Sequence, residues 1–146
     1  MNPLIRPEPT LNYTARCSIY TDAAWNSTTG CAGLGWIIDD RNSSSQHTAT
    51  STFVSSPLMA ETLAVSTAMT FALLHGIDSI SLFSDSQILI KTLNRQEKKL
   101  EIYGVFCDIY HLSLSFKSVK FVFIPRAANV RADSIAKQAL WALNQS

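Results

Sequence analysis

The stretch CSIYTD, residues 17–22, decides how the rest of the chain is interpreted. Its β-branched and aromatic residues predict a strand that ends at Asp22, an acid where the core favours an apolar residue. Two further strands are predicted over residues 33–38 and 47–54, with a turn at residues 39–45 between them. Three strands joined by short turns predict an antiparallel meander.

The pattern changes from strand to helix at Pro57, a residue that a first helical turn tolerates. A helix rich in Ala, Leu and Met is predicted from Leu58 to about His75, and Gly76 is its stop. An antiparallel meander followed by parallel crossover units predicts an α/β fold, with a mixed five-stranded sheet flanked by helices. The remaining predicted elements are a strand at 79–83, a helix capped by Ser84 that runs to about Leu93, a helix at 100–114, a strand at 119–124, and a helix from the cap Asn129 to about Leu143.

Length and composition favour a single folded domain. The chain has 146 residues, of which 47% are hydrophobic and 16% are charged, which is too apolar for a disordered protein. We expect the domain over residues 16–144, after a proline-bearing tail or linker over residues 1–15. No membrane segment is expected, because Glu61 and several Ser and Thr residues interrupt the longest apolar run, residues 53–74.

The cysteines and the N-terminal residues predict an intracellular location, nuclear or cytoplasmic. Cys17, Cys31 and Cys107 are odd in number and far apart, which is typical of reduced thiols and not of a disulfide framework. The first fifteen residues, with three prolines, do not have the pattern of a signal peptide.

The net charge of +1 hides an asymmetry between the two parts of the chain. Residues 1–90 hold three basic and seven acidic residues, whereas residues 91–146 hold nine basic and four acidic ones. A basic segment can contact a polyanion, but it is more often an ordinary solvated surface.

Four acids lie at positions where the predicted fold brings them together. Asp22 and Asp85 follow strands, and Glu61 and Asp133 lie near the starts of helices. Strand ends and the starts of the following helices share one edge of a parallel sheet. Glu61 also shares the apolar helix row that continues with Ala64. Taken singly, each acid could be a turn, cap or first-turn residue.

Four converging carboxylates repel one another strongly unless cations neutralise them. Oxygen ligands without His or Cys favour Mg²⁺ or Mn²⁺ over zinc. Two such ions, about 3.5–4 Å apart, form the arrangement that clamps the attacking and leaving oxygens of a phosphodiester. Without these four acids the chain carries +5, which suits a nucleic-acid backbone.

These residues resemble type 1 ribonuclease H, and most closely the archaea-like branch found in plant LINE-type (non-LTR) retrotransposon polyproteins. The resemblance covers roughly residues 16–143, nearly the whole chain. It rests on four motifs that occur in order, at Tyr20–Trp25, Ala60–Ala64, Ser84–Ser86 and Pro125–Ala136.

The resemblance implies endonucleolytic cleavage of the RNA strand of an RNA–DNA hybrid, with two Mg²⁺ ions that Mn²⁺ can replace. It implies that Asp22 bridges both ions and that Glu61 and Asp85 help to hold the ion near the leaving group. Asp133 then holds the ion that activates the attacking water. Arg126 stands in the loop where bacterial-type members have a histidine, and it is a further candidate catalytic residue.

Contacts to the substrate are harder to carry over by resemblance. Many family members read the hybrid through Asn or Gln before the helix glutamate, but this chain has Pro57 and Leu58 there. Leu58 has no side-chain hydrogen-bonding group, which puts hybrid affinity in doubt and not the chemistry. The candidate substrate-binding residues are Trp25, Asn26, Ser56, Ser86 and Asn129.

Two other kinds of protein share parts of this pattern. One is a ribonuclease H-like binding module with weak or no turnover, which a degraded substrate groove would fit. The other is a DNA exonuclease or transposase-like nuclease, although the exonuclease usually shows Asp-x-Glu on the first strand, where this chain has Ala24. We expect the isolated domain to be a monomer and part of a larger reverse-transcriptase polyprotein.

Overall fold

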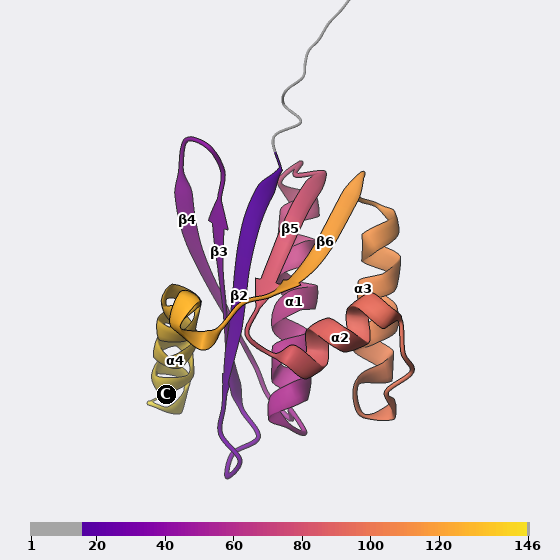
Figure 1. The fold of residues 1–146 in the computed structure, drawn as a ribbon. Helices are drawn as coiled ribbons and strands as arrows, with labels where there is room; N and C mark the ends of the chain where they lie inside the picture. Colours follow the sequence, from indigo (N-terminus) through magenta and orange to yellow (C-terminus); the bar gives the residue numbers. More distant parts are fainter. Residues whose placement is uncertain (1–15, 146) are drawn as a thin grey trace, which may run out of the picture.

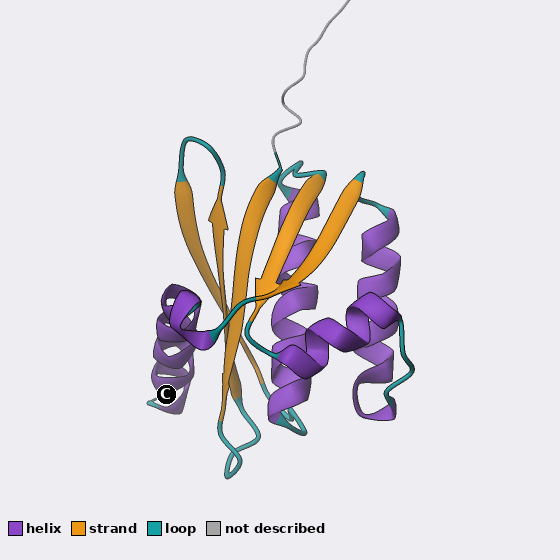
Figure 2. Ribbon diagram, viewed as in Figure 1, coloured by secondary structure: helices purple, strands orange, loops and turns teal. Residues whose placement is uncertain are grey.

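The computed structural model describes residues 16–145, so the predicted tail over residues 1–15 lies outside the described residues. Helices flank a single twisted sheet (Figures 1 and 2). The order of elements agrees with the predicted order. The elements are β2 (Cys17–Trp25), β3 (Ala32–Asp39), β4 (Ser44–Ser51), α1 (Pro57–Leu74), β5 (Ser79–Ser84), α2 (Gln87–Arg95), η2 (Leu100–Ile102), α3 (Tyr103–Leu114), β6 (Ser118–Phe123), η3 (Arg126–Ala128) and α4 (Val130–Asn144).

The five strands form one mixed sheet in the order β4-β3-β2-β5-β6. The meander β2-β3-β4 is antiparallel, and β2, β5 and β6 run parallel to one another. This confirms the predicted α/β architecture. The side chain of Arg16 donates hydrogen bonds to the Ile80 carbonyl and the Ser118 hydroxyl, and so ties the start of β2 to its two parallel neighbours.

Helix α1 provides most of the core on one face of the sheet. Its predicted apolar row is fully buried, with Ala64, Val65, Ala68 and Ala72 at 0% exposure. The small alanine side chains let the helix lie close to the strands, and α3 packs beside α1 on the same face (Figure 1). By length and mean hydropathy α1 could also cross a membrane. Its buried row packs in the same core cluster as sheet residues such as Ile19, as expected for a core helix.

Helix α4 packs on the opposite face, where two glycines of β3 allow a very close approach. A Cβ atom on Gly33 would lie 2.1 Å from the Ala136 carbonyl oxygen, and one on Gly35 would lie 2.9 Å from the Ala132 carbonyl oxygen. No side chain fits between the strand and the helix at these two positions. The glycines therefore set the position of α4 over β3 and β2.

Several predicted boundaries and caps are wrong in detail. Strand β2 does not end at Asp22 but continues to Trp25, because its ladder with β3 extends that far. Strand β4 begins and ends three residues earlier than predicted, because it pairs with β3 from Asp39↔Ser44 onward. Helix α2 is capped by Ser86 and not by Ser84, whose hydroxyl instead accepts a hydrogen bond from the Ser86 N–H at 3.0 Å.

We predict that Gly33→Ala destabilises the fold by about 1–3 kcal/mol, because the new methyl group forces α4 away from β3. Gly104→Ala is the matched control, since nothing lies within 4 Å of a Cβ at that helical position. It is expected to stabilise the protein by up to about 1 kcal/mol. Denaturant unfolding of both variants tests this, and equal stabilities would contradict the close approach of α4.

Candidate active site

Asp22 lies in β2 at the point where the sheet opens on one side. On the β3 side it pairs with Gly35. On the other side the ladder with β5 ends at the pair Tyr20↔Phe83, two residues before Asp22. Other elements can therefore reach the carboxylate from beyond the end of β5, although Asp22 is only 4% exposed. The Ala23 N–H donates to its Oδ1 at 2.9 Å and fixes its orientation.

Glu61 and Asp85 reach Asp22 from two other elements. Glu61 lies in the second turn of α1, a helix that Ser56 caps by accepting a hydrogen bond from the Met59 N–H at 3.0 Å. Asp85 directly follows β5. One carboxylate oxygen from each of Asp22, Glu61 and Asp85 lies within 4.8 Å of the others. Three of the four predicted acids thus form one tight cluster.

Asp133 joins this cluster from the other face of the sheet. It lies in the first turn of α4, where its carboxyl interacts with that of Asp22. Its Oδ2 is also 3.1 Å from the Nζ of Lys137, one helical turn later. Lys137 is not among the residues predicted from the sequence. Its i, i+4 spacing from Asp133 is the signal that could have found it.

Asn129 holds α4 against β2 and corrects two predictions. Its side chain does not cap α4; the Nδ2 donates to the Thr21 carbonyl at 2.8 Å instead. The residue is 2% exposed, so it has no surface to offer a substrate. Its own carbonyl accepts from the Asp133 N–H at 3.1 Å. Through these two hydrogen bonds, Asn129 fixes the position of Asp133 relative to Asp22.

Burial and mutual repulsion make the cluster hold protons in the absence of metal. Burial is the main cause that raises the pKa of Asp22 to about 6, against the lowering effect of its hydrogen bond with Glu61. Burial, followed by the charge of Asp22, raises the pKa of Glu61 to about 10. Such neighbouring carboxyl groups are fully ionised at neutral pH only when a cation compensates them.

The donor set fits a hard divalent cation. Glu61 Oε1 and Asp85 Oδ2 are enclosed, and within residues 16–145 neither has a hydrogen-bond partner. A buried carboxylate oxygen without a partner is unfavourable, and a metal ion is one of the few groups that satisfies several at once. Because all the converging ligands are carboxylates, they suit Mg²⁺ or Mn²⁺ and not zinc.

Two of the predicted substrate-binding residues shape the turn beside the site. The Trp25 Nε1–H donates to the Val54 carbonyl at 2.9 Å, so the partly buried indole joins β2 to the segment before α1. Asn26 Oδ1 accepts from the N–H groups of Thr28 and Thr29 at 2.8 and 3.2 Å, which closes the turn between β2 and β3. Contact of Trp25 and Asn26 with a substrate stays a prediction.

The two predicted serines are both helix caps. Ser56 donates to Glu101 Oε2 at 2.5 Å as well as capping α1, and Ser86 accepts from the Leu89 N–H at 3.3 Å at the start of α2. Arg126 is exposed on η3, the short turn that leads to Asn129. For these three residues, too, contact with a substrate stays a prediction.

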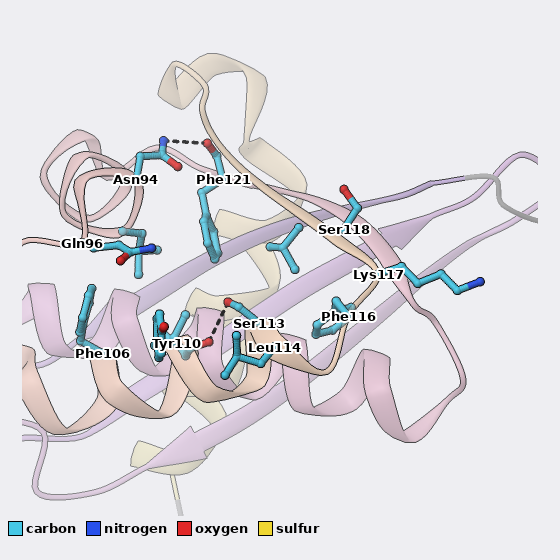
Figure 3. Close-up of a pocket in the computed structure, with 13 residues that line it drawn as sticks. Asn94, Gln96, Phe106, Tyr110, Ser113, Leu114, Phe116, Lys117, Ser118 and Phe121 are labelled. Carbon is cyan, nitrogen blue, oxygen red and sulfur yellow. Dashed lines mark hydrogen bonds between the residues drawn. The ribbon is translucent and has the colours of Figure 1, made fainter.

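A second hollow lies away from the acids, between α2, α3 and β6 (Figure 3). Its volume is about 410 Å³, and Phe106, Tyr110 and Phe121 contribute aromatic walls. It is lined by no Asp, Glu, His or Cys residue, so it lacks the usual protein ligands of a metal ion. The ligands for the metal predicted from the sequence therefore lie in the carboxylate cluster and not in this hollow.

Comparison with known protein families agrees with this geometry. A family described as reverse transcriptase-like matches residues 20–139, which include all four acids. The chain belongs to this family. A comparison with curated proteins found no match.

Solved structures show that this reverse transcriptase-like chain has the ribonuclease H fold. Ribonuclease H1 from the halophilic archaeon Halobacterium salinarum is 26% identical, with a TM-score of 0.74 over 90% of this chain and 99% of that one. LC11-RNase H1, solved in complex with an RNA/DNA hybrid, is 23% identical, with a TM-score of 0.79 over 88% and 99%. An N-terminal ribonuclease H domain from Mycobacterium tuberculosis is 19% identical, with a TM-score of 0.76 over 90% and 97%.

We predict that, without metal, the wild type loses stability relative to Glu61→Gln as the pH rises. The folded protein keeps the Glu61 proton up to about pH 10, whereas the unfolded chain releases it near 4.5. The contribution of the protonated Glu61 carboxyl to stability is complete below the pKa of Glu61 in the unfolded chain. It is lost as the pH rises toward the pKa of Glu61 in the folded protein. Melting temperatures in EDTA between about pH 5 and about pH 9 measure the difference in stability between the wild type and Glu61→Gln. His47, whose pKa is lowered by burial, contributes equally to the pH dependence of both proteins.

Mg²⁺ at about pH 8 should then raise the melting temperature of the wild type and raise that of Glu61→Gln much less, because the metal binds deprotonated carboxylates. Parallel pH curves for the two proteins in EDTA would contradict the raised pKa of Glu61.

We also predict that Asn129→Ala destabilises the fold by about 1–3 kcal/mol, because it leaves the buried Thr21 carbonyl without its donor. Asn94→Ala is the matched control, since Asn94 makes the same kind of bond to the Phe121 carbonyl at 3.0 Å on the exposed surface. Denaturant titration should show a loss of less than about 1 kcal/mol for the control. Equal losses would mean that Asn129 does not have the positioning role described above.

Proposed function

We propose that this chain hydrolyses the RNA strand of RNA–DNA hybrids with two divalent metal ions. The observation that carries the proposal is the gathering of Asp22, Glu61 and Asp85 oxygens within 4.8 Å, with Asp133 beside Asp22. Membership of the reverse transcriptase-like family and the likeness to ribonuclease H1 enzymes support it.

Each acid has a place in this mechanism that follows from its surroundings. Asp22 interacts with each of the other three acids, so in this proposal it is the ligand that two ions would share. Glu61 and Asp85 would hold one ion, and Asp133 would hold the other. When bound, the ions supply activation of the attacking water and compensation of charge on the leaving oxygen.

Other residues serve the substrate and the product in this proposal. Arg126, which is exposed on η3 three residues before Asn129, is in this proposal the residue that contacts a phosphate of the substrate. Without the four acids the chain carries a charge of +5, which favours binding to a nucleic-acid backbone. The 2′-hydroxyl groups of the RNA strand are what distinguish the strand to be cut from DNA.

We further propose that residues 16–144 act as the ribonuclease H domain of a retrotransposon reverse-transcriptase polyprotein in the nucleus or cytoplasm. The reverse transcriptase-like family supports this context. When isolated, the domain is expected to be a monomer.

We predict that Asp22→Asn reduces cleavage of a labelled RNA–DNA hybrid by more than about 100-fold, because loss of outer-shell partners of a metal already costs about 10–100-fold. Asp108→Asn, which removes an exposed acid on α3, is the matched control and should cleave like the wild type. Gel assays with hybrid, duplex DNA and duplex RNA, each with Mg²⁺ and with EDTA, test substrate and metal together.

The melting temperature of Asp22→Asn should not fall below that of the wild type in EDTA, because the substitution removes a carboxyl that burial disfavours in its charged form. Cleavage by Asp22→Asn at the wild-type rate would overturn the mechanism. Hybrid binding by the wild type without cleavage in Mg²⁺ or Mn²⁺ would instead favour the alternative of an inactive binding module.

A further inference from the structure

Phe53 is the most exposed large hydrophobic residue that the structure describes. It lies between β4 and α1 with 96% of its surface exposed. Its backbone has a φ of +57°, in the left-handed region that bulky residues rarely adopt. The side chain thus makes almost no contact with the fold that holds its backbone in an unfavourable conformation.

The backbone around Phe53 is fixed by its neighbours. The Val54 N–H donates to the Gly30 carbonyl at 2.7 Å, and the Val54 carbonyl accepts from the Trp25 indole at 2.9 Å. Val54 itself is only 5% exposed. The loop is therefore anchored to the turn between β2 and β3, and Phe53 is held outward by a well-defined structure.

No local need of the fold accounts for a phenylalanine at this position. Gln96 is the other non-glycine residue of the described part with positive φ, and it ends α2 in the ordinary left-handed cap. Phe53 ends no helix, and glycine or asparagine would adopt its backbone conformation more readily. Strained residues of this kind cluster at active sites and ligand-binding sites.

The position of Phe53 relates it to the carboxylate cluster. It lies three residues before Ser56, the cap of α1, and Glu61 lies in the second turn of that helix. The loop before α1 and the turn between β2 and β3 lie together at the lower end of the view in Figure 1. Phe53 therefore lies on the exposed segment that leads into the helix carrying Glu61.

We infer that Phe53 is a substrate-contacting residue that packs its ring against the sugars of the duplex in the minor groove. The inference rests on the proposed function and deepens it. The wide, shallow minor groove of an A-form-like duplex displays sugars and 2′-hydroxyl groups, and an aromatic ring can pack there without reading a sequence. The Leu58 side chain has no hydrogen-bonding group, so in this inference the segment contacts the groove through an apolar ring.

The test uses Phe53→Gly, in which the effects on folding and on binding have opposite signs. Glycine relieves the backbone strain, so the melting temperature should stay the same or rise. Binding of a fluorescently labelled RNA–DNA hybrid, measured by anisotropy in EDTA, should weaken by about tenfold because the ring is lost. Leu74→Ala is the matched control, since Leu74 is 79% exposed at the other end of α1 and should bind like the wild type.

A Phe53→Trp variant reports on contact, because its fluorescence should change on addition of unlabelled hybrid by more than that of the wild type, which has three tryptophans of its own, while its affinity stays close to that of the wild type. Steady-state cleavage should show the loss in Phe53→Gly as a higher KM with little change in kcat. Equal hybrid affinity of Phe53→Gly and the wild type would overturn the role of Phe53. Failure of the wild type to cleave hybrid would overturn the proposed function and is measured separately from binding.

Discussion

The early end of the pairing between β2 and β5 is the constraint on which the site depends. The ladder stops at Tyr20↔Phe83, yet β2 continues with β3 to Trp25. One edge of a central strand is thereby left without a β5 partner over residues 21–25, and Asp22 is the second of these residues. Helix α1 on one face and α4 on the other can then both deliver a carboxylate to the same strand, which a fully paired sheet would prevent.

Much of the fold follows from the sequence because local pattern and global architecture agree. The alanine row of α1 is buried, as its spacing predicts, and Pro57 is the first residue of that helix. The errors lie at the ends of elements, where side chains had two plausible partners. Ser86 and not Ser84 caps α2, and Asp22 lies within its strand because pairing with β3 outweighs the poor strand propensity of aspartate.

The convergence of the acids could be predicted because the predicted fold brings strand ends and helix starts to one edge of the sheet, and three of the four acids do lie together there. The residues that support them could not. Asn129 is expected to be an ordinary cap, and only the tertiary packing of α4 on β2 shows that its amide reaches the Thr21 carbonyl. The hydrogen bond from Trp25 to Val54 likewise joins residues far apart in the sequence, so no local sequence pattern predicts it.

The two outer strands of the sheet also have a consequence for how the molecule behaves in a crowded solution. Strand β4 (SSQHTATS) is almost wholly polar, and the Phe121 carbonyl on the far side of β6 already accepts a hydrogen bond from the Asn94 amide. Lys120 adds a charge to β6, the short strand at this edge of the sheet. Because β4 is polar and β6 is only six residues long, neither edge strand offers a long apolar template for pairing with another chain.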